Sequence, residues 1–173
     1  MGRIGQAIAR RAFGFGMKVV YHNRSRLDAS AEAACNASYL PKCDLLSASD
    51  HVILCLPYTP AVHHTIGSAE LSLMKPTSTL INIARGGIVD DAALAAALRN
   101  HTIAAAGLDV FEGEPRVHPD LLSVPNVVLT PHIASATAST RLAMAELAAD
   151  NIIGYLCDGK AITPINPEIL MGK

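Results

Sequence analysis

Residues 78–110, STLINIARGGIVDDAALAAALRNHTIAAAGLDV, contain one complete unit of alternating structure. The apolar run 78–83 predicts a strand that stops at the polar turn ARGG. Residues 90–100 repeat Ala and Leu at helical spacing behind an acidic first turn, which suits the dipole of a helix. The apolar run 103–110 predicts a second strand. This order of strand, helix and strand indicates two parallel strands joined by a crossover helix.

The same alternation extends along the chain in both directions. We expect further helices at 5–15, 44–49, 67–74 and 138 to about 156, and further strands at 17–21, 51–56 and 125–129. Short strands separated by helices predict an α/β fold with a mostly parallel sheet. Polar or Gly-rich residues follow most of the strands. In such sheets, ligands bind at the carboxyl ends of the strands.

The first five residues, MGRIG, contain the second half of the pattern G-x-G-x-x-G. That pattern binds the pyrophosphate of a dinucleotide, because glycine permits close approach and a helix N-terminus presents unpaired N–H groups. We therefore predict that the cofactor phosphates are bound by Gly2, Arg3, Ile4 and Gly5. The alternative is an ordinary strand-to-helix turn, since short Gly pairs are common in loops.

The residues YHNRSR, at the end of the first predicted strand, indicate which nicotinamide cofactor binds. Proteins that bind NAD place a carboxylate here for the ribose hydroxyls, but this chain has no acidic residue before Asp28. An arginine among small polar donors suits a ribose 2′-phosphate. We predict that Asn23, Arg24 and Ser25 bind the cofactor, with NADP(H) favoured over NAD(H). Alternatively, Arg24 and Arg26 are only solvated loop residues.

Three longer motifs are more specific than the glycines. They are TLINIARGGIVDDAAL at 79–94, AAAGLDVFEGEP at 104–115 and VVLTPHIASAT at 127–137. In this order they resemble the D-isomer-specific 2-hydroxyacid dehydrogenase family, and the resemblance extends from Gly2 to about Asn166. YHNRS, CLPYT and LDVFEGEP are most similar to its glyoxylate, hydroxypyruvate and 2-ketogluconate reductases. The resemblance implies a Rossmann-type, doubly wound parallel sheet and NAD(P)H-dependent reduction of a small 2-oxoacid to the D-2-hydroxyacid.

The resemblance also implies a catalytic trio. Arg85 matches the family's substrate-binding arginine, Glu114 the partner of its histidine, and His132 its acid/base. A planar guanidinium suits the adjacent carboxylate and carbonyl of a 2-oxoacid. An imidazole that titrates near neutrality can protonate the carbonyl oxygen, and a neighbouring carboxylate favours its charged form. Each of these residues alone would also fit a surface or capping position.

Five further residues match the family's cofactor cleft. Asp109 corresponds to an aspartate near the nicotinamide amide. The others would line the cleft through backbone and packing: Leu56, Pro57, Ile83 and Ala84. Ordinary packing at strand ends is the alternative for all five. His63 and His64 are interpreted as structural or interfacial residues.

Full-length members of the family carry a substrate-binding domain and a first sheet strand before the Gly-rich turn. Neither precedes Met1, so we expect an N-terminally truncated chain; the alternative is a fragment whose strand edges pair with another chain. The absent strand would lie in mid-sheet and leave two neighbours unpaired. We expect a dinucleotide-binding domain at 1–156 and a tail at 157–173 that returns to the substrate domain. A homodimer is expected for the full-length form.

Composition limits the remaining possibilities. Half of the residues are apolar, the formal charge is −1, and no apolar run reaches the roughly 18 residues of a membrane span. No basic cluster favours nucleic acid. The four cysteines lack metal-ligand spacing and are interpreted as reduced, mostly buried thiols; without a secretory signal, this predicts a cytoplasmic protein with no metal site. A non-catalytic nucleotide-sensing module and a decayed fragment are the alternative functions.

Overall fold

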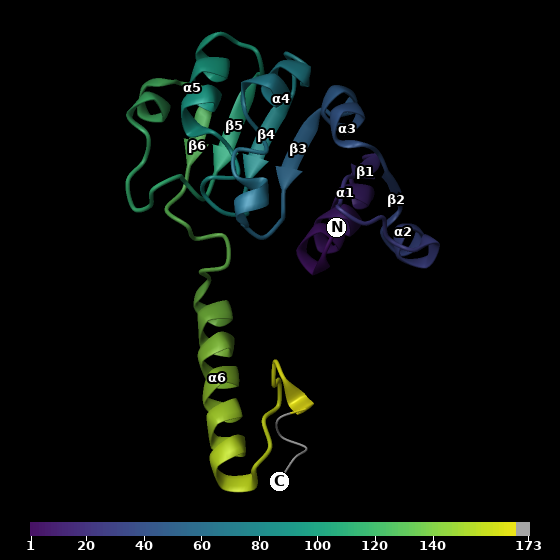
Figure 1. Ribbon diagram of the computed structural model, residues 1–173, viewed down its shortest axis with the longest axis vertical. Helices are drawn as coiled ribbons and strands as arrows, with labels where there is room; N and C mark the ends of the chain where they lie inside the picture. The colour runs from purple at the N-terminus through teal and green to yellow at the C-terminus, as the bar shows by residue number, and fades with distance from the viewer. Residues whose placement is uncertain (169–173) are drawn as a thin grey trace. The chain divides into compact units, whose positions relative to one another are not determined.

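In the computed structural model, helices alternate with parallel strands from residue 1 to residue 131 (Figure 1). The structure describes residues 1–168, and the chain divides into two compact units between Pro131 and His132. The elements of the first unit are α1 (Arg3–Gly14), β1 (Val19–Tyr21), α2 (Ala29–Cys35), β2 (Ala37–Tyr39), α3 (Lys42–Ala48), β3 (His51–Leu54), the 3-10 helix η1 (Pro60–Val62), α4 (Ser68–Leu73), β4 (Thr79–Asn82), α5 (Asp91–Arg99), β5 (Ala105–Leu108), the 3-10 helix η2 (Pro119–Ser123) and β6 (Val127–Leu129).

The strands of the first unit form two separate parallel sheets. One has the order β3-β4-β5-β6, with Leu54 opposite Asn82 and Asn82 opposite Leu108; the other pairs β1 with β2. Every pair is parallel, which confirms the predicted α/β fold. Within residues 1–168, β1 pairs only with β2, and β3 pairs on one side only, with β4. Each therefore keeps one unpaired edge, as expected for these two strands.

The four-stranded sheet carries the main hydrophobic core. Leu80 of β4 is fully buried, as are Leu94 and Leu98 of α5, which cover it in one cluster. The helix begins where the acidic pair in the sequence predicts, because the carboxylate of Asp90 accepts the N–H of Ala93 at 2.9 Å. Packing of α5 therefore fixes the turn between β4 and the helix.

The sequence pattern predicts each α-helix and strand of the first unit to within two residues, except α2 and β2, and it does not predict the 3-10 helices η1 and η2. α2 has seven residues and β2 has three, so neither shows a clear periodicity. Only the ends of α2 carry signals. Asp28 caps its start, and Asn36 ends it in the left-handed conformation with φ of 49°.

The second unit contains α6 (Ala138–Asp158) and the segment after it. The hydroxyl of Thr137 caps the helix, and Gly159 ends it with φ of 65°. The chain then turns back along α6, where the N–H of Thr163 donates to Asn151 Oδ1 at 2.8 Å (Figure 1). Residues 159–168 of the expected tail are therefore folded against α6; residues 169–173 lie outside the described residues. The domain limits 1–156 and 157–173 stay predictions.

The cysteines are less buried than predicted. All four are free, but Cys43 and Cys157 are exposed, Cys55 is half-buried and Cys35 alone is buried. The prediction of mostly buried thiols is wrong because Cys43 and Cys157 occupy solvent-facing positions of α3 and α6. Separately, none of the helices within residues 1–168 combines the length and the apolar character that crossing a membrane requires.

Candidate active site

The turn after β4 depends on a close approach between two backbone segments. A Cβ added to Gly86 would lie 1.8 Å from the carbonyl oxygen of Phe111, so glycine alone fits this position. The side chain of Asn82 holds the turn on its other side. Its Oδ1 accepts the N–H of Ala84 at 3.1 Å, and its Nδ2 donates to the carbonyl oxygen of Arg85 at 3.3 Å. These contacts fix the point at which Arg85 leaves the sheet.

Arg85 is exposed and lines an open pocket of about 400 Å³. Its Nη1 donates to the carbonyl oxygen of Ala84 at 2.6 Å, which orients the guanidinium. The remaining N–H groups of an arginine fork suit a planar anion. Three segments of the first unit form the pocket: residues 58 and 63, residues 85–87 and residues 111–114. A volume of this size accommodates a small organic ligand.

Glu114 lies on the loop after β5 and lines the same pocket as Arg85. Its Oε1 accepts the N–H of Phe111 at 3.0 Å, within its own loop. The loop is also tied to α5, because the N–H of Glu112 donates to Asp91 Oδ2 at 3.0 Å. Asp91 is buried, and burial raises the pKa of its carboxyl. The first unit thus brings two of the three predicted catalytic residues to one pocket.

The predicted cleft residues lie at the carboxyl edge of the four-stranded sheet. Asp109 is 5% exposed, and its Oδ1 accepts the hydroxyl of Thr130 at 2.6 Å. Its backbone N–H donates to the carbonyl oxygen of Asn82, the last residue of β4, at 3.0 Å. The others follow the ends of β3 and β4: Leu56, Pro57, Ile83 and Ala84. This edge is where open parallel sheets bind ligands.

His132 is the first residue of the second unit. Its side chain is exposed, and its φ of 55° lies in the left-handed region. Arg85 and Glu114 belong to the first unit. The catalytic roles of all three residues therefore stay predictions.

The predicted phosphate-binding turn forms the N-terminus of α1. Gly2 is the N-cap residue, and the first turn contains no acidic side chain. N–H groups in a first helical turn have no intrahelical acceptor and are available to an anion. The end of β1 lies beside this turn, because the amino group of Met1 donates to Asn23 Oδ1. The first-turn residues are Arg3, Ile4 and Gly5.

The polar residues after β1 differ in how they are held. Arg26 binds Glu32 through Nε at 2.8 Å and Nη2 at 2.9 Å. Arg24 and Ser25 are exposed, and within residues 1–168 the Arg24 side chain has no hydrogen bond or ion pair. The first carboxylate after β1, that of Asp28, caps α2. Of the two arginines, Arg24 is therefore the one available to a ligand.

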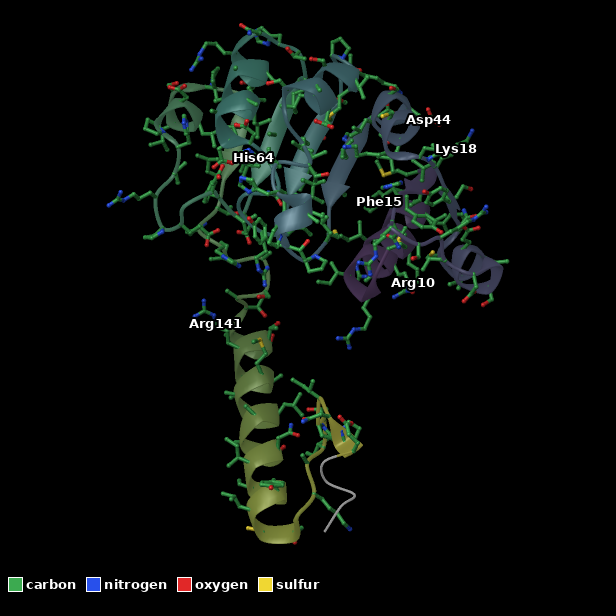
Figure 2. All side chains as sticks on the ribbon, in the orientation of Figure 1. Arg10, Phe15, Lys18, Asp44, His64 and Arg141 are labelled. Carbon is green, nitrogen blue, oxygen red and sulfur yellow. The ribbon has the colours of Figure 1, made fainter. Side chains whose placement is uncertain are left out.

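The pocket also contains residues that the sequence patterns do not connect. Tyr58, His63, Phe111 and Glu112 line it, and His64 contacts Glu112 with Nε2 and Oε2 2.8 Å apart. Figure 2 labels His64, in the loop between β3 and α4. The adjacent His pair is visible in the sequence, but its contact with Glu112 spans 48 positions and requires the fold.

The parallel sheet, the helix that Gly2 caps and the pocket at the strand ends define a dinucleotide-binding α/β domain of the Rossmann type. The sequence profile described as "D-isomer specific 2-hydroxyacid dehydrogenase, NAD binding domain" matches residues 1–134. The chain belongs to this family. The resemblance found in its motifs is thereby confirmed.

Named relatives share most of this chain. Glyoxylate reductase from Thermococcus onnurineus is 51% identical over 98% of this chain and 50% of that protein. Glyoxylate/hydroxypyruvate reductase B from Enterobacter agglomerans is 49% identical over 98% of this chain and 53% of that protein. The NADPH-dependent glyoxylate/hydroxypyruvate reductase from Sinorhizobium meliloti, solved with NADP and malonate, is 44% identical with a TM-score of 0.86, over 95% of this chain and 50% of that one. The chain spans about half the length of these relatives.

Proposed function

We propose that this chain supplies the cofactor-binding domain, residues 1–156, of an enzyme that reduces a small 2-oxoacid to the D-2-hydroxyacid. Glyoxylate and hydroxypyruvate are the proposed substrates, with 2-ketogluconate in the same chemical class. The pocket lined by both Arg85 and Glu114 is the observation that supports this proposal. Family membership and the names of the relatives support the reaction type.

In the proposed reaction, Arg85 binds the substrate. Its guanidinium forms paired hydrogen bonds with the carboxylate and the neighbouring carbonyl oxygen of the 2-oxoacid. The hydrogen bond from Nη1 to Ala84 holds the group in a fixed orientation, so less conformational entropy is lost on binding. As the carbonyl oxygen gains negative charge, the guanidinium stabilises it.

Glu114 and His132 carry out the proton transfer in the proposed reaction. His132 donates it to the carbonyl oxygen, and the carboxylate of Glu114 favours the imidazolium that makes this donation. The loop contact from Phe111 to Glu114 keeps the carboxylate oriented. The nicotinamide cofactor supplies the hydride when bound.

The first unit has groups that suit such a cofactor. The N-terminus of α1, with Gly2 at its cap, suits the pyrophosphate. We propose NADP(H), bound by Asn23, Arg24 and Ser25, because the Arg24 side chain is exposed and the first carboxylate after β1 in the sequence, that of Asp28, is engaged in capping α2. A homodimer through the cofactor-binding domains is part of the proposal.

The test uses a chimera in which residues 1–173 replace the matching half of the Thermococcus onnurineus glyoxylate reductase. We expect NADPH absorbance to fall when glyoxylate or hydroxypyruvate is added, with the intact relative as the positive control. A chimera that melts cooperatively yet consumes no NADPH with any small 2-oxoacid would contradict the proposal.

Cofactor preference is tested by Arg24→Ser in the same chimera. The loss of one cation facing the 2′-phosphate is expected to raise KM for NADPH about tenfold while KM for NADH stays within twofold. Arg10→Ser, on the exposed side of α1, is the matched control. Equal changes of KM for NADPH in the two variants would show that Arg24 does not bind the 2′-phosphate.

A further inference from the structure

Two histidines and a glutamate gather on the rim of the Arg85 pocket without a place in the proposed reduction. His64 Nε2 lies 2.8 Å from Glu112 Oε2, and His63 Nε2 lies 3.9 Å from Glu112 Oε1. One donor atom from each of the three side chains lies within 4.8 Å of the other two. The two imidazole rings are stacked with centroids 3.8 Å apart. Three ligands from two loops thus converge on one point.

These separations suit a small cation. A tetrahedral zinc ion with bonds of about 2.0–2.2 Å needs its ligand atoms about 3.3–3.5 Å apart. His64 Nε2 lies closer than this to Glu112 Oε2, at 2.8 Å, and His63 Nε2 lies farther than this from Glu112 Oε1, at 3.9 Å. Rotation of the side chains is therefore needed to bring one donor atom of each residue to the required separation. Two imidazole nitrogens and a carboxylate oxygen are a donor set that zinc and its neighbours in the first transition series prefer.

The backbone under the cluster is fixed by hydrogen bonds. The N–H of His64 donates to the carbonyl oxygen of Gly87 at 2.8 Å. On the other loop, the N–H of Glu112 donates to Asp91 Oδ2 at 3.0 Å. Ligands on a preorganised backbone lose less entropy when they bind an ion. The cluster is therefore held in place by the fold.

A contact outside the cluster orients the ring of His63. The hydroxyl of Tyr58 lies 3.2 Å from Nδ1 of His63, and when it accepts the Nδ1 proton the lone pair of His63 is on Nε2. The carboxylate of Asp90 lies 3.9 Å from Nδ1 of His64, which is beyond hydrogen-bond distance. A hydrogen-bond partner on the far nitrogen, as at His63, is typical of histidines that bind metals.

We propose that His63, His64 and Glu112 bind a divalent transition-metal ion, for which Zn²⁺ is the probe. Three protein ligands leave a fourth position for water or an anion beside the Arg85 pocket. The prediction from sequence is that no metal site is present, because these ligands come from two loops that lie far apart in the sequence. The proposal does not depend on the proposed reduction, since metal binding requires neither substrate nor nucleotide.

The test is a calorimetric titration of the untagged 173-residue chain with Zn²⁺, after dialysis against a chelator and with the thiols kept reduced. We expect one saturable site, and His64→Asn is expected to weaken it at least about tenfold. His101→Asn is the matched control, because His101 and His64 share the left-handed backbone, with φ of 54° and 50°, that asparagine tolerates. This control is expected to leave the affinity unchanged.

Glu112→Gln provides a second variant, and Co²⁺ provides a second probe. Cobalt bound by nitrogen and oxygen shows d–d bands without the charge-transfer bands of thiolates, which separates this site from the exposed Cys43 and Cys157. Thiolate bands, or unchanged Zn²⁺ affinity in both variants, would overturn the proposal. The same Zn²⁺ titration is repeated on the chimera, whose reductase activity shows that it is folded. Zinc affinity and reductase activity are measured separately, so the metal-site proposal and the proposed function can each fail without the other.

Discussion

Gly86 sets the distance between the two loops that form the pocket. A methyl group at this position would meet the carbonyl oxygen of Phe111 at 1.8 Å, a backbone atom that cannot rotate away. We predict that Gly86→Ala lowers the free energy of unfolding by about 1–3 kcal/mol or more. Urea unfolding measures this, with Gly107→Ala as control because a Cβ there meets nothing within 4 Å. Equal midpoints for the two variants would contradict the close approach.

The buried carboxyl of Asp91 makes the stability of the fold depend on pH. Burial raises the pKa of its carboxyl above the usual 3.8, so the folded state binds this proton more tightly than the unfolded state does. Ionised Asp91 therefore lowers stability above its folded pKa, and this penalty disappears as the pH falls toward 3.8. We predict that Asp91→Asn, which keeps an oxygen for the N–H of Glu112, is at least as stable as wild type near pH 7.

Urea midpoints measured from about pH 7 to about pH 4 test this sign. The wild type is expected to gain stability relative to Asp91→Asn as the pH falls. A wild-type advantage that grows toward neutral pH would show that the hydrogen bond to Glu112 outweighs burial.

The sequence predicted the position of individual residues at the pocket only where those residues belong to a sequence motif. Arg85 and Glu114 stand in ARGG and FEGEP, and the fold brings both to one pocket. Glu112 and His64 were not connected, because no local pattern records a contact between loops that meet only through the parallel sheet. Arg24 and Arg26 look alike in sequence, and only the ion pair with Glu32 separates them.

At the scale of the element, Glu32 connects α2 to β1. Hydrogen bonds from Arg26 and from the hydroxyl of Tyr21 lower the pKa of Glu32 from 4.5 to about 2. Its contribution to stability is therefore complete above about pH 4.5 and is lost as the pH falls toward 2. We predict that wild-type stability falls more steeply than that of Glu32→Gln between about pH 5 and pH 3. Parallel pH slopes in denaturant unfolding would contradict this contribution.

Helices and strands were easier to predict from the sequence when they were long and buried a face in the hydrophobic core. α5 shows helical spacing because it buries a full face on the sheet, and its acidic N-cap marks where it starts. α2 and β2 are too short for a period to appear, and Asp28 at the cap of α2 is a signal that many turns share. For α6, the spacing predicts the helix, but the return of Thr163 to Asn151 depends on side-chain hydrogen bonds that no period encodes.

At the scale of the whole molecule, the division of the sheet is the dominant feature. β4 is paired on both sides, whereas within residues 1–168 β1 is paired only with β2. We predict that backbone amides of β4 exchange with deuterium at least tenfold more slowly than those of β1, because the unpaired edge of β1 opens locally at lower cost. Hydrogen-exchange mass spectrometry of the 173-residue chain measures this. Equal protection of β1 and β4 would mean that β1 gains a partner that residues 1–168 do not supply.

The central claim is that Arg85 binds the 2-oxoacid, and one comparison tests it most directly. In the chimera, kcat/KM for glyoxylate is measured for Arg85→Lys and for Arg116→Lys, an arginine exposed on the loop after β5. Lysine keeps the charge but loses the planar fork, so we predict a fall of about 100-fold or more for Arg85→Lys and a change within twofold for Arg116→Lys. Full activity of the Arg85→Lys chimera would contradict the account.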